Sequence, residues 1–281
     1  MPRIATRCPC CDATQLDRQS AVLMPFVARR ALGWEPCEVT AEWGLRDLPV
    51  GHALALCSTL HCPGCGLVFL DMRFDDAEMA RLYHAYRGPV YEAERESFEP
   101  GYAVRNRALV AGDAHVPAVE AFLRPWVPAQ PALLDWGGDT GLNTPLRAVA
   151  RLHHVLDISG QAPIEGVVAV QRPSTDPYDL IVLAHVLEHI PEPASLLAEV
   201  AAAMAPATRL YVEVPFEALM RAAVGDPLAW RRKRHWHEHV NFFSEGALRA
   251  LLQRCDLQML ATTQLRLAGG AVALGLICER A

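Results

Sequence analysis

Two short segments of this chain are rich in histidine. Residues 185–189 read HVLEH and residues 237–239 read HEH, so Glu238 directly precedes His239. Histidine is the side chain whose ordinary pKa lies closest to neutral pH, and it can therefore accept or release a proton under mild conditions. The histidines of these two segments are the first candidates for groups that move a proton.

The first segment also matches the pattern H-x-x-E-H, which in one class of zinc peptidases places two histidines on one face of a helix. That pattern must lie within a helix, whereas this segment follows an apolar, strand-like run and precedes Pro191. No separate carboxylate ligand is identifiable downstream of it. We interpret the match as accidental.

A glycine-rich turn is the most informative feature of the sequence. It follows an apolar run in the stretch LLDWGGDTG, which begins at Leu133 and ends at Gly141. Glycine is needed in such a turn where a ligand approaches the backbone closely or where φ is positive. Because a helix-like segment at 142–150 comes next, the order predicts a strand, a nucleotide-contacting loop and a helix.

Asp157 stands at the end of the next strand-like run, VLDIS, 22 positions after Asp135 (157 − 135). An acidic residue about 20 positions beyond the first strand commonly accepts hydrogen bonds from ribose hydroxyls. The turn GGDTG does not match the phosphate loop G-x-G-x-x-G of dinucleotide-binding proteins. The sequence therefore disfavours a nicotinamide dehydrogenase.

Strand-like runs alternate with helix-like stretches beyond residue 129. Such alternation predicts an α/β fold, with a doubly wound, mostly parallel sheet of seven strands. The last two strands flank Gly269 and Gly270 and predict an antiparallel hairpin, while Ser244 is the expected N-cap of the last helix. The expected strands are 132–135, 154–158, 167–170, 178–184, 209–214, 258–267 and 272–279, and the expected helices are 142–150, 193–205 and 244–255.

Four cysteines form two C-x-x-C pairs in the N-terminal quarter of the chain: Cys8, Cys11, Cys62 and Cys65. Four thiolates from two tight turns can complete a closed, tetrahedral zinc site of the structural kind. The pairs are 51 positions apart (62 − 11), so we expect residues 13–56 to loop out. Cys10 and Cys57 could compete as ligands, and a set of unliganded buried thiols is the alternative.

The composition is that of an ordinary globular protein, with 52% hydrophobic and 21% charged residues. Lys and Arg total 26 against 32 Asp and Glu, and the net charge of −6 argues against a broad basic face for nucleic acid. The N-terminus lacks an apolar signal segment, and no run reaches the roughly 18 apolar residues of a membrane helix. We therefore expect a cytoplasmic location.

We expect three units along the chain. They are a zinc-binding module with a long insertion at 1–73, a helical linker or lid at 74–128, and an α/β domain at 129–281. The second boundary follows from three prolines between positions 125 and 131, through which a helix cannot run. The tyrosines between 83 and 102 are interpreted as packing residues.

In order, the motifs DWGGDTG, VLDIS, YDLIVLAHVLEHIPEP and LYVEVP resemble those of class I S-adenosylmethionine-dependent methyltransferases, over about 133–279. The resemblance implies the Rossmann-like methyltransferase fold and a site for S-adenosylmethionine. Asp139 replaces the middle glycine of the family's loop, where it could crowd the cofactor's carboxylate or hydrogen-bond its amino group. The positions that the resemblance assigns to the cofactor are Asp135, Gly137, Gly138, Asp139, Gly141, Asp157, Ile158, Ala184, His185 and Val186.

The four-cysteine module, HVLEHIPEP and HEHVNFFS together are similar to zinc-containing methyltransferases that modify nucleotide-linked sugars and related glycan or natural-product precursors. In that group a histidine preceded by glutamate serves as general base, which matches Glu238 and His239 here, and His189 matches a second active-site histidine. The resemblance implies a structural zinc ion and a small-molecule or glycan-precursor acceptor. This chain departs from the group by ending soon after the α/β domain, without the further C-terminal domain of many members.

Two other functions stay open. An RNA methyltransferase would use the cysteine module to grip RNA, but residues 22–75 balance their charges and are rich in apolar residues. A zinc-stabilised binding or scaffold protein would keep the cofactor fold without catalysis. The basic run at 231–234 is either a solvated face or a holder for a substrate phosphate.

Overall fold

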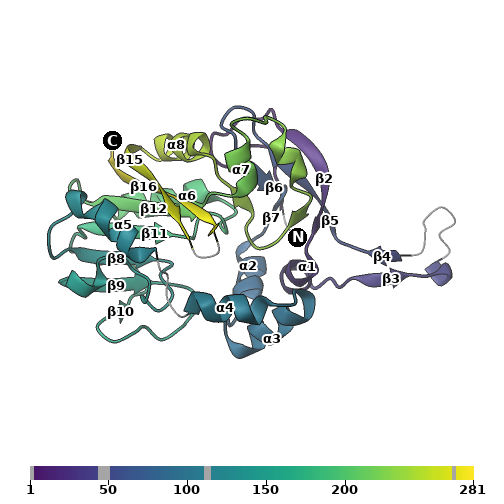
Figure 1. Cartoon of the computed structure of the whole chain (residues 1–281), viewed down its shortest axis with the longest axis horizontal. Coiled ribbons are helices and arrows are strands. Elements are labelled where there is room, and N and C mark those ends of the chain that lie inside the picture. Colours follow the sequence, from purple (N-terminus) through teal and green to yellow (C-terminus); the bar gives the residue numbers. More distant parts are fainter. Residues whose placement is uncertain (1–2, 44–50, 111–114, 268–269) are drawn as a thin grey trace.

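The computed structural model describes residues 3–43, 51–110, 115–267 and 270–281. These residues form two larger β-sheets, with helices between and around them (Figure 1). Within this part of the chain, no helix combines the length and the apolar character needed to cross a bilayer.

The larger sheet has seven strands in the order β10-β9-β8-β11-β12-β16-β15. Neighbouring strands are parallel from β10 to β12, whereas β16 runs antiparallel to both β12 and β15. The predicted doubly wound sheet with a C-terminal antiparallel hairpin is confirmed. The strands are β8 (Ala132–Trp136), β9 (Leu152–Leu156), β10 (Val168–Ala169), β11 (Leu180–Ala184), β12 (Arg209–Pro215), β15 (Leu257–Arg266) and β16 (Val272–Arg280).

Helices cover both faces of this sheet. Apolar residues of α6 (Pro193–Ala202) and α8 (Glu245–Arg254) join one core with one side of the central strands. Those of α5 (Val116–Leu123) join a second core with the other side. Because both faces are buried, β8 and β11 can be apolar without alternation, as their sequences are.

The prediction of a helix at 142–150 is wrong. The chain instead makes turns and a short 3₁₀ segment, η3 (Arg147–Val149). Pro145 has no amide hydrogen for a helical bond and disfavours helical backbone in the residue before it, and Leu146 is left-handed with φ of 64°. The Thr144 hydroxyl donates a hydrogen bond to Asp135 and holds the turn against β8.

The second sheet joins distant parts of the chain in the order β13-β2-β5-β6-β14. β13 pairs in parallel with β2, and β14 pairs antiparallel with β6. A segment that lies between β12 and α8 in sequence thus completes a sheet begun near the N-terminus. Its strands are β2 (Asp17–Leu23), β5 (Leu56–His61), β6 (Val68–Leu70), β13 (His235–Trp236) and β14 (Asn241–Phe242).

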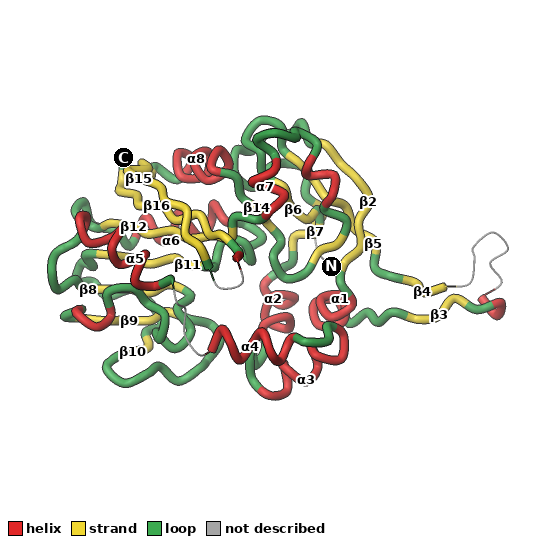
Figure 2. Tube along the Cα trace, in the orientation of Figure 1, coloured by secondary structure: helices red, strands yellow, loops and turns green. Residues whose placement is uncertain are grey.

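Residues 13–56 do not loop out as a whole, so that prediction is corrected. β2 pairs with β5 along its length, and α1 (Pro25–Leu32) buries one apolar face. Only the hairpin of β3 (Cys37–Val39) and β4 (Gly51–Ala53) projects from the body (Figure 2). The separation of the cysteine pairs indicated only a long insertion, and the burial available to β2 and α1 explains why most of it folds.

Further helices lie between the two sheets, beside α1 (Figure 1). The first of them begins with a capping box, in which Asp75 and Glu78 each accept a hydrogen bond from the other's backbone N–H. These elements are α2 (Asp76–Tyr83), α3 (Pro89–Phe98) and α4 (Tyr102–Val110). The remaining short elements are β1 (Arg3–Ile4), β7 (Met72–Arg73), α7 (Ala218–Ala222), η1 (Ala41–Trp43), η2 (Arg124–Trp126) and η4 (Ala229–Arg232).

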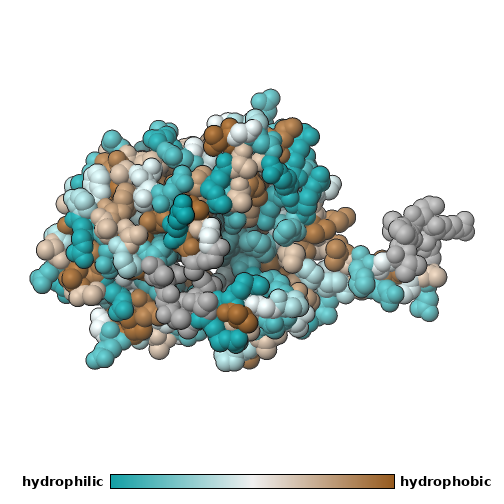
Figure 3. Space-filling view, viewed as in Figure 1, coloured by the Kyte–Doolittle hydropathy of each residue, from teal (hydrophilic) through white to brown (hydrophobic). Residues whose placement is uncertain are grey.

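The surface in Figure 3 is mixed, with hydrophobic side chains in small groups among hydrophilic ones. Exposed large hydrophobic residues come from many separate elements, including the hairpin and the loops of the α/β domain. This face therefore gives no sign of a broad apolar docking surface.

Asn241 on β14 ties the second sheet to the loop after β11. Its side chain is 1% exposed, and its amide donates to the carbonyls of Leu187 at 2.9 Å and Ile190 at 2.7 Å. Its oxygen accepts from Arg73 at 2.9 Å. Each of these polar groups is removed from water, so the loop depends on the amide for its hydrogen bonds.

We expect Asn241→Leu to lower the free energy of unfolding by about 2–3 kcal/mol, because two carbonyls and a guanidinium each lose one hydrogen bond. Urea denaturation measures this change. Gln264→Leu, an exposed substitution on β15, is the control and should stay within about 0.5 kcal/mol of the wild type. Equal effects of the two substitutions would contradict the role given to Asn241.

Candidate active site

The glycine turn after β8 is packed tightly against its surroundings. Gly137 has φ of 85°, and a Cβ there would come within 2.5 Å of the Val186 side chain. A Cβ on Gly138 would lie 2.3 Å from the carboxyl carbon of Asp135. Side chains at either position would push the turn away from β8 or from the loop after β11, so glycine is required at both.

Asp157 lies beside this turn. It is the first residue after β9, which ends two residues earlier than expected, at Leu156. Its carboxylate accepts backbone hydrogen bonds from Asp139 at 2.8 Å and Ser159 at 2.6 Å. Asp139 has φ of 52°, and its own carboxylate accepts from the Ser159 hydroxyl at 3.2 Å. Burial, reinforced by the charge of Asp157, raises the pKa of Asp139.

Asp135, near the end of β8, is buried beneath the turn. Burial raises the pKa of its carboxyl to about 7, although the hydrogen bond from Thr144 acts in the opposite direction. The Thr144 hydroxyl also lies 3.0 Å from Nε2 of His153 on β9. Asp135 therefore fixes the base of the turn from inside the protein.

His185 follows β11 with φ of 56° and belongs to a buried ionic network. Its Nε2 lies 2.8 Å from Oε1 of Glu213 on β12, and Nε2 of His115 lies 2.9 Å from the same oxygen. Burial acts to lower the pKa of His185, but its contacts with Glu188 and Glu213 outweigh burial and raise the pKa to about 10. His185 is thus a cation held between carboxylates and is unsuited to act as a base near neutral pH.

His189 and His239 meet edge to face, with ring centroids 4.6 Å apart. Nδ1 of His189 lies 2.6 Å from the Tyr83 hydroxyl of α2 and 3.2 Å from the backbone carbonyl of Glu238. Nδ1 of His239 is shielded from solvent and has no hydrogen-bond partner among the described residues. Burial lowers the pKa of both imidazoles, and for His239 the neighbouring His189 lowers it further. Both rings are therefore neutral at pH 7.

Glu238 does not orient His239 through a hydrogen bond. Its carboxylate faces Arg95 of α3, with Nη1 at 2.7 Å from one oxygen and Nη2 at 2.8 Å from the other. A buried guanidinium–carboxylate pair with two parallel hydrogen bonds allows only a narrow range of relative orientations. Glu238 therefore joins α3 to the histidine segment, and its backbone carbonyl faces His189.

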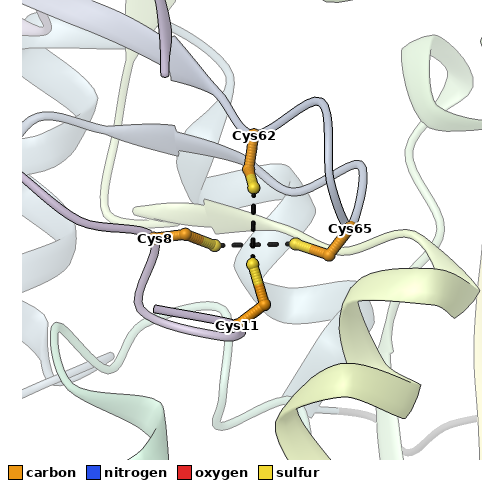
Figure 4. Close-up of side chains that lie close together, drawn as sticks. All are labelled: Cys8, Cys11, Cys62 and Cys65. Atoms are coloured by element: carbon orange, nitrogen blue, oxygen red, sulfur yellow. Dashed lines mark hydrogen bonds between the residues drawn. The ribbon is translucent and has the colours of Figure 1, made fainter. Parts of the chain in front are cut away.

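The four cysteines of the two C-x-x-C pairs converge on one point from two loops (Figure 4). Their sulfur atoms all lie within 4.8 Å of one another, and the pairs Cys8–Cys65 and Cys11–Cys62 are 3.5 Å apart. Cys10 and Cys57 are buried but are not part of this cluster. The cluster has the donor set and the compactness of a tetrathiolate metal site.

Comparison with known protein families decides the class of this protein. Residues 113–262, more than half of the chain, match a family described as a methyltransferase domain. The chain belongs to this family. Together with its strand order and its glycine turn, the match makes it an S-adenosylmethionine-dependent methyltransferase. A comparison with curated proteins found no match.

The methyltransferase also resembles solved structures at low identity. One is the 1,6-didemethyltoxoflavin-N1-methyltransferase of Burkholderia thailandensis, solved with 1,6-didemethyltoxoflavin and S-adenosylhomocysteine (17% identity, 66% of this chain and 86% of that chain covered, TM-score 0.48). Another is a glycopeptide N-methyltransferase (13% identity, TM-score 0.46).

The match to the glycopeptide N-methyltransferase covers 60% of this chain and 91% of that chain. A methyltransferase in calicheamicin biosynthesis, in its S-adenosylhomocysteine-bound form, is 16% identical, with 68% of this chain and 59% of that chain covered and a TM-score of 0.45. Because all three scores are below 0.5, the classification of the methyltransferase depends on the family match and on its own strand order.

The methyltransferase brings most of its predicted cofactor positions together at the carboxyl ends of β8, β9 and β11. Gly137 touches Val186, Gly138 touches Asp135, and Asp139 is bonded to Asp157. Ala184 is the last residue of β11, opposite Glu213 of β12. Ile158 is the exception, because its side chain is 84% exposed.

Four residues of the site were missed by sequence reasoning: Tyr83, Arg95, His115 and Glu213. A carboxylate inside the apolar run LYVEVP was a usable signal for Glu213, since a buried charge needs a partner. The helical segments that carry Tyr83 and Arg95 gave no comparable signal. Their contacts with His189 and Glu238 span more than 100 positions of sequence.

The basic run at 231–234 divides between two environments. Its three arginines are exposed, as expected for a solvated face. Lys233 is buried, with its ammonium 4.7 Å from the Trp236 ring centroid and 4.1 Å from that of Phe242. Burial lowers the pKa of Lys233 to about 8. This lysine therefore contributes to packing under the second sheet.

The raised pKa of Asp135 predicts a pH-dependent stability. Between about pH 4 and pH 7 the folded protein keeps a proton on this carboxyl that the unfolded chain releases, so stability is lost as pH rises through this range. The slope is at most about 1.4 kcal/mol per pH unit. Unfolding of the cofactor-free protein, compared with Asp135→Asn, measures it. Parallel pH profiles for the two proteins would show that Asp135 does not titrate in this way.

Proposed function

We propose that this methyltransferase transfers the methyl group of S-adenosylmethionine to a hydroxyl or carbon of a small-molecule acceptor, of the class of sugar nucleotides, glycan precursors or natural-product precursors. The observation that carries the proposal is the position of two neutral histidines: His189 lies on the loop that adjoins the glycine turn, and His239 lies against His189. Val186, which touches Gly137, is three residues from His189.

On the cofactor side, the glycine turn would lie along the methionine part of S-adenosylmethionine, and Asp157 would hold the ribose. Asp157 has the oxygens for this role, because each of them accepts one backbone hydrogen bond and a carboxylate oxygen can accept two. The carboxylates of Asp139 and Asp157 also give this place a negative charge. That charge suits the amino group and the sulfonium of the cofactor.

On the acceptor side, the sulfonium methyl group is already activated, so the protein must align the acceptor and receive its proton. We assign proton removal to the His239 side of the site, where an imidazole nitrogen lacks a partner, and positioning of the acceptor to His189. Glu238 supports both through Arg95 and its carbonyl. Lowered pKa values keep both rings neutral, which is the form that can receive a proton.

For the cysteine cluster we propose a structural zinc ion. Tetrahedral zinc with Zn–S bonds of about 2.3 Å separates its sulfur ligands by about 3.8 Å. Two of the sulfur separations are 3.5 Å and all are within 4.8 Å, which is compatible with this value. The ion would join the loop after β1 to the loop between β5 and β6, and it would take no part in the transfer.

The RNA hypothesis has less support. On the second sheet the exposed Arg18 is paired with Asp71 at 2.9 Å, so its charge is partly neutralised. A scaffold that retains the cofactor fold would not need two neutral, buried histidines beside the turn. We therefore keep the small-molecule acceptor as the proposal.

The decisive experiment combines calorimetry with S-adenosylmethionine and radiolabelled methyl transfer, screened over sugar nucleotides and glycans. We expect His239→Gln to bind the cofactor as the wild type does but to lose about 100-fold or more in kcat. For Asp157→Asn we expect the main effect on binding, with cofactor affinity lowered about 10-fold or more. His154→Gln, on β9, is the matched control. Full activity of His239→Gln would remove its assigned role, and a wild type that binds no cofactor would end the proposal.

Removal of one thiolate tests the zinc assignment. We expect Cys62→Ser to contain one zinc equivalent less per chain than the wild type, as measured by elemental analysis, and to unfold at a lower temperature. Cys57→Ser, which changes a buried thiol outside the cluster, should keep its metal. Equal zinc contents in the three proteins would show that the cluster does not hold the ion.

A further inference from the structure

Glu188 is a buried carboxylate without hydrogen bonds. It is 2% exposed, and neither of its oxygens has a hydrogen-bond partner among the described residues. Two basic atoms lie near Oε1: Nδ1 of His185 at 3.4 Å and Nε2 of His189 at 3.9 Å. A carboxylate removed from water in this way costs free energy unless a cation or a donor completes its surroundings.

The imidazole of His189 has its free lone pair on the side of Glu188. Its Nδ1 lies 3.2 Å from the carbonyl oxygen of Glu238, which can only accept a hydrogen bond. With the proton on Nδ1, where the Tyr83 hydroxyl oxygen at 2.6 Å can also accept it, Nε2 is left as an electron-pair donor 3.9 Å from the Glu188 carboxylate. A histidine that donates one ring N–H to a backbone carbonyl is the usual form of a metal ligand.

His239 supplies a third donor. Its Nδ1 is shielded from solvent and unpartnered, so this side chain, like Glu188, has an unmet polar atom. One donor atom from each of Glu188, His189 and His239 lies within 4.8 Å of the others. Two side chains with unmet polar atoms and an imidazole nitrogen beside them, brought together by two separate loops, fit a common ligand better than independent defects.

We propose that Glu188, His189 and His239 bind a divalent transition-metal ion, separate from the ion of the cysteine cluster. Two imidazole nitrogens and one carboxylate oxygen suit ions from Mn²⁺ to Zn²⁺ and disfavour Ca²⁺, which takes oxygen ligands. Backbone hydrogen bonds hold the loop of Glu188 and the loop after His239 together. The backbone N–H groups of Val240 and Asn241 donate to the Glu188 carbonyl at 2.7 Å and 3.1 Å.

The ion would take part in the proposed methyl transfer. Its catalytic role rests on that proposed function, whereas its binding does not. Three protein ligands leave coordination positions for an oxygen of the acceptor, and a bound cation lowers the pKa of such a hydroxyl. His239 then acts as a ligand, and its side of the site promotes proton loss through the ion. The reaction class and the cofactor site are unchanged.

Metal binding is tested without cofactor or acceptor, on the full chain with zinc already bound to the cysteines and weaker metals removed by chelation. Titration with Co²⁺ should show one further equivalent, with the absorption of nitrogen and oxygen ligation and without a sulfur-to-cobalt band. Glu188→Gln and His239→Gln should weaken this binding about 100-fold or more, whereas His154→Gln should not change it.

No uptake of Co²⁺ beyond the cysteine site, or a sulfur-to-cobalt band from the added equivalent, would overturn the site even if both variants failed to fold. Unchanged binding by Glu188→Gln would do the same. Methyl transfer that survives chelation unchanged would overturn the role at the acceptor. Because binding is measured without cofactor, failure of the metal site leaves the proposed methyl transfer intact, and failure of the transfer assay leaves metal binding intact.

Discussion

The carbonyl oxygen of Glu188 accepts backbone hydrogen bonds from both Val240 and Asn241, and the site depends on this junction. One partner is the loop after β11, and the other is the segment that enters β14. The two histidine segments are about 50 positions apart in sequence, and neither has a regular helix or a long strand to fix it. These bonds and those of the Asn241 side chain hold the segments of His189 and His239 against each other. The chemistry proposed here therefore follows from a short stretch of backbone pairing.

Burial then determines what each ionisable group can do. His185 lies between two carboxylates and is held as a cation, whereas His189 and His239 lie among rings and are held neutral. Three histidines of similar sequence context thus reach different protonation states. Glu188 has the charge of His185 at 3.4 Å but no hydrogen bond to its oxygens among the described residues, whereas Glu213 accepts hydrogen bonds from its neighbours. This contrast separates the structural network around Glu213 from the proposed ligand set.

The sequence was sufficient for the features that depend on local pattern. The parallel sheet and its final hairpin followed from apolar periodicity, Ser244 was recognised as an N-cap, and the C-x-x-C pairs were recognised from spacing. It failed where a single residue or a distant partner decides the structure. Pro145 and the left-handed Leu146 abolish the helix expected after the glycine turn, and the pairing of Glu238 with Arg95 depends on how α3 packs. Long-range contacts of this kind leave no periodicity in a single sequence.

The pairing of β13 with β2 and of β14 with β6 has a consequence for rearranging the gene. The cysteine module and the catalytic half interlock, since strands from one complete the sheet of the other. Removal of residues 1–73 would take away β2 and β6, which pair with β13 and β14. Backbone groups of β13 and β14 would then lose their hydrogen-bond partners. A chimera that joins this module to a related enzyme would also have to contain residues 235–242. A single crossover point cannot supply both parts of the shared sheet.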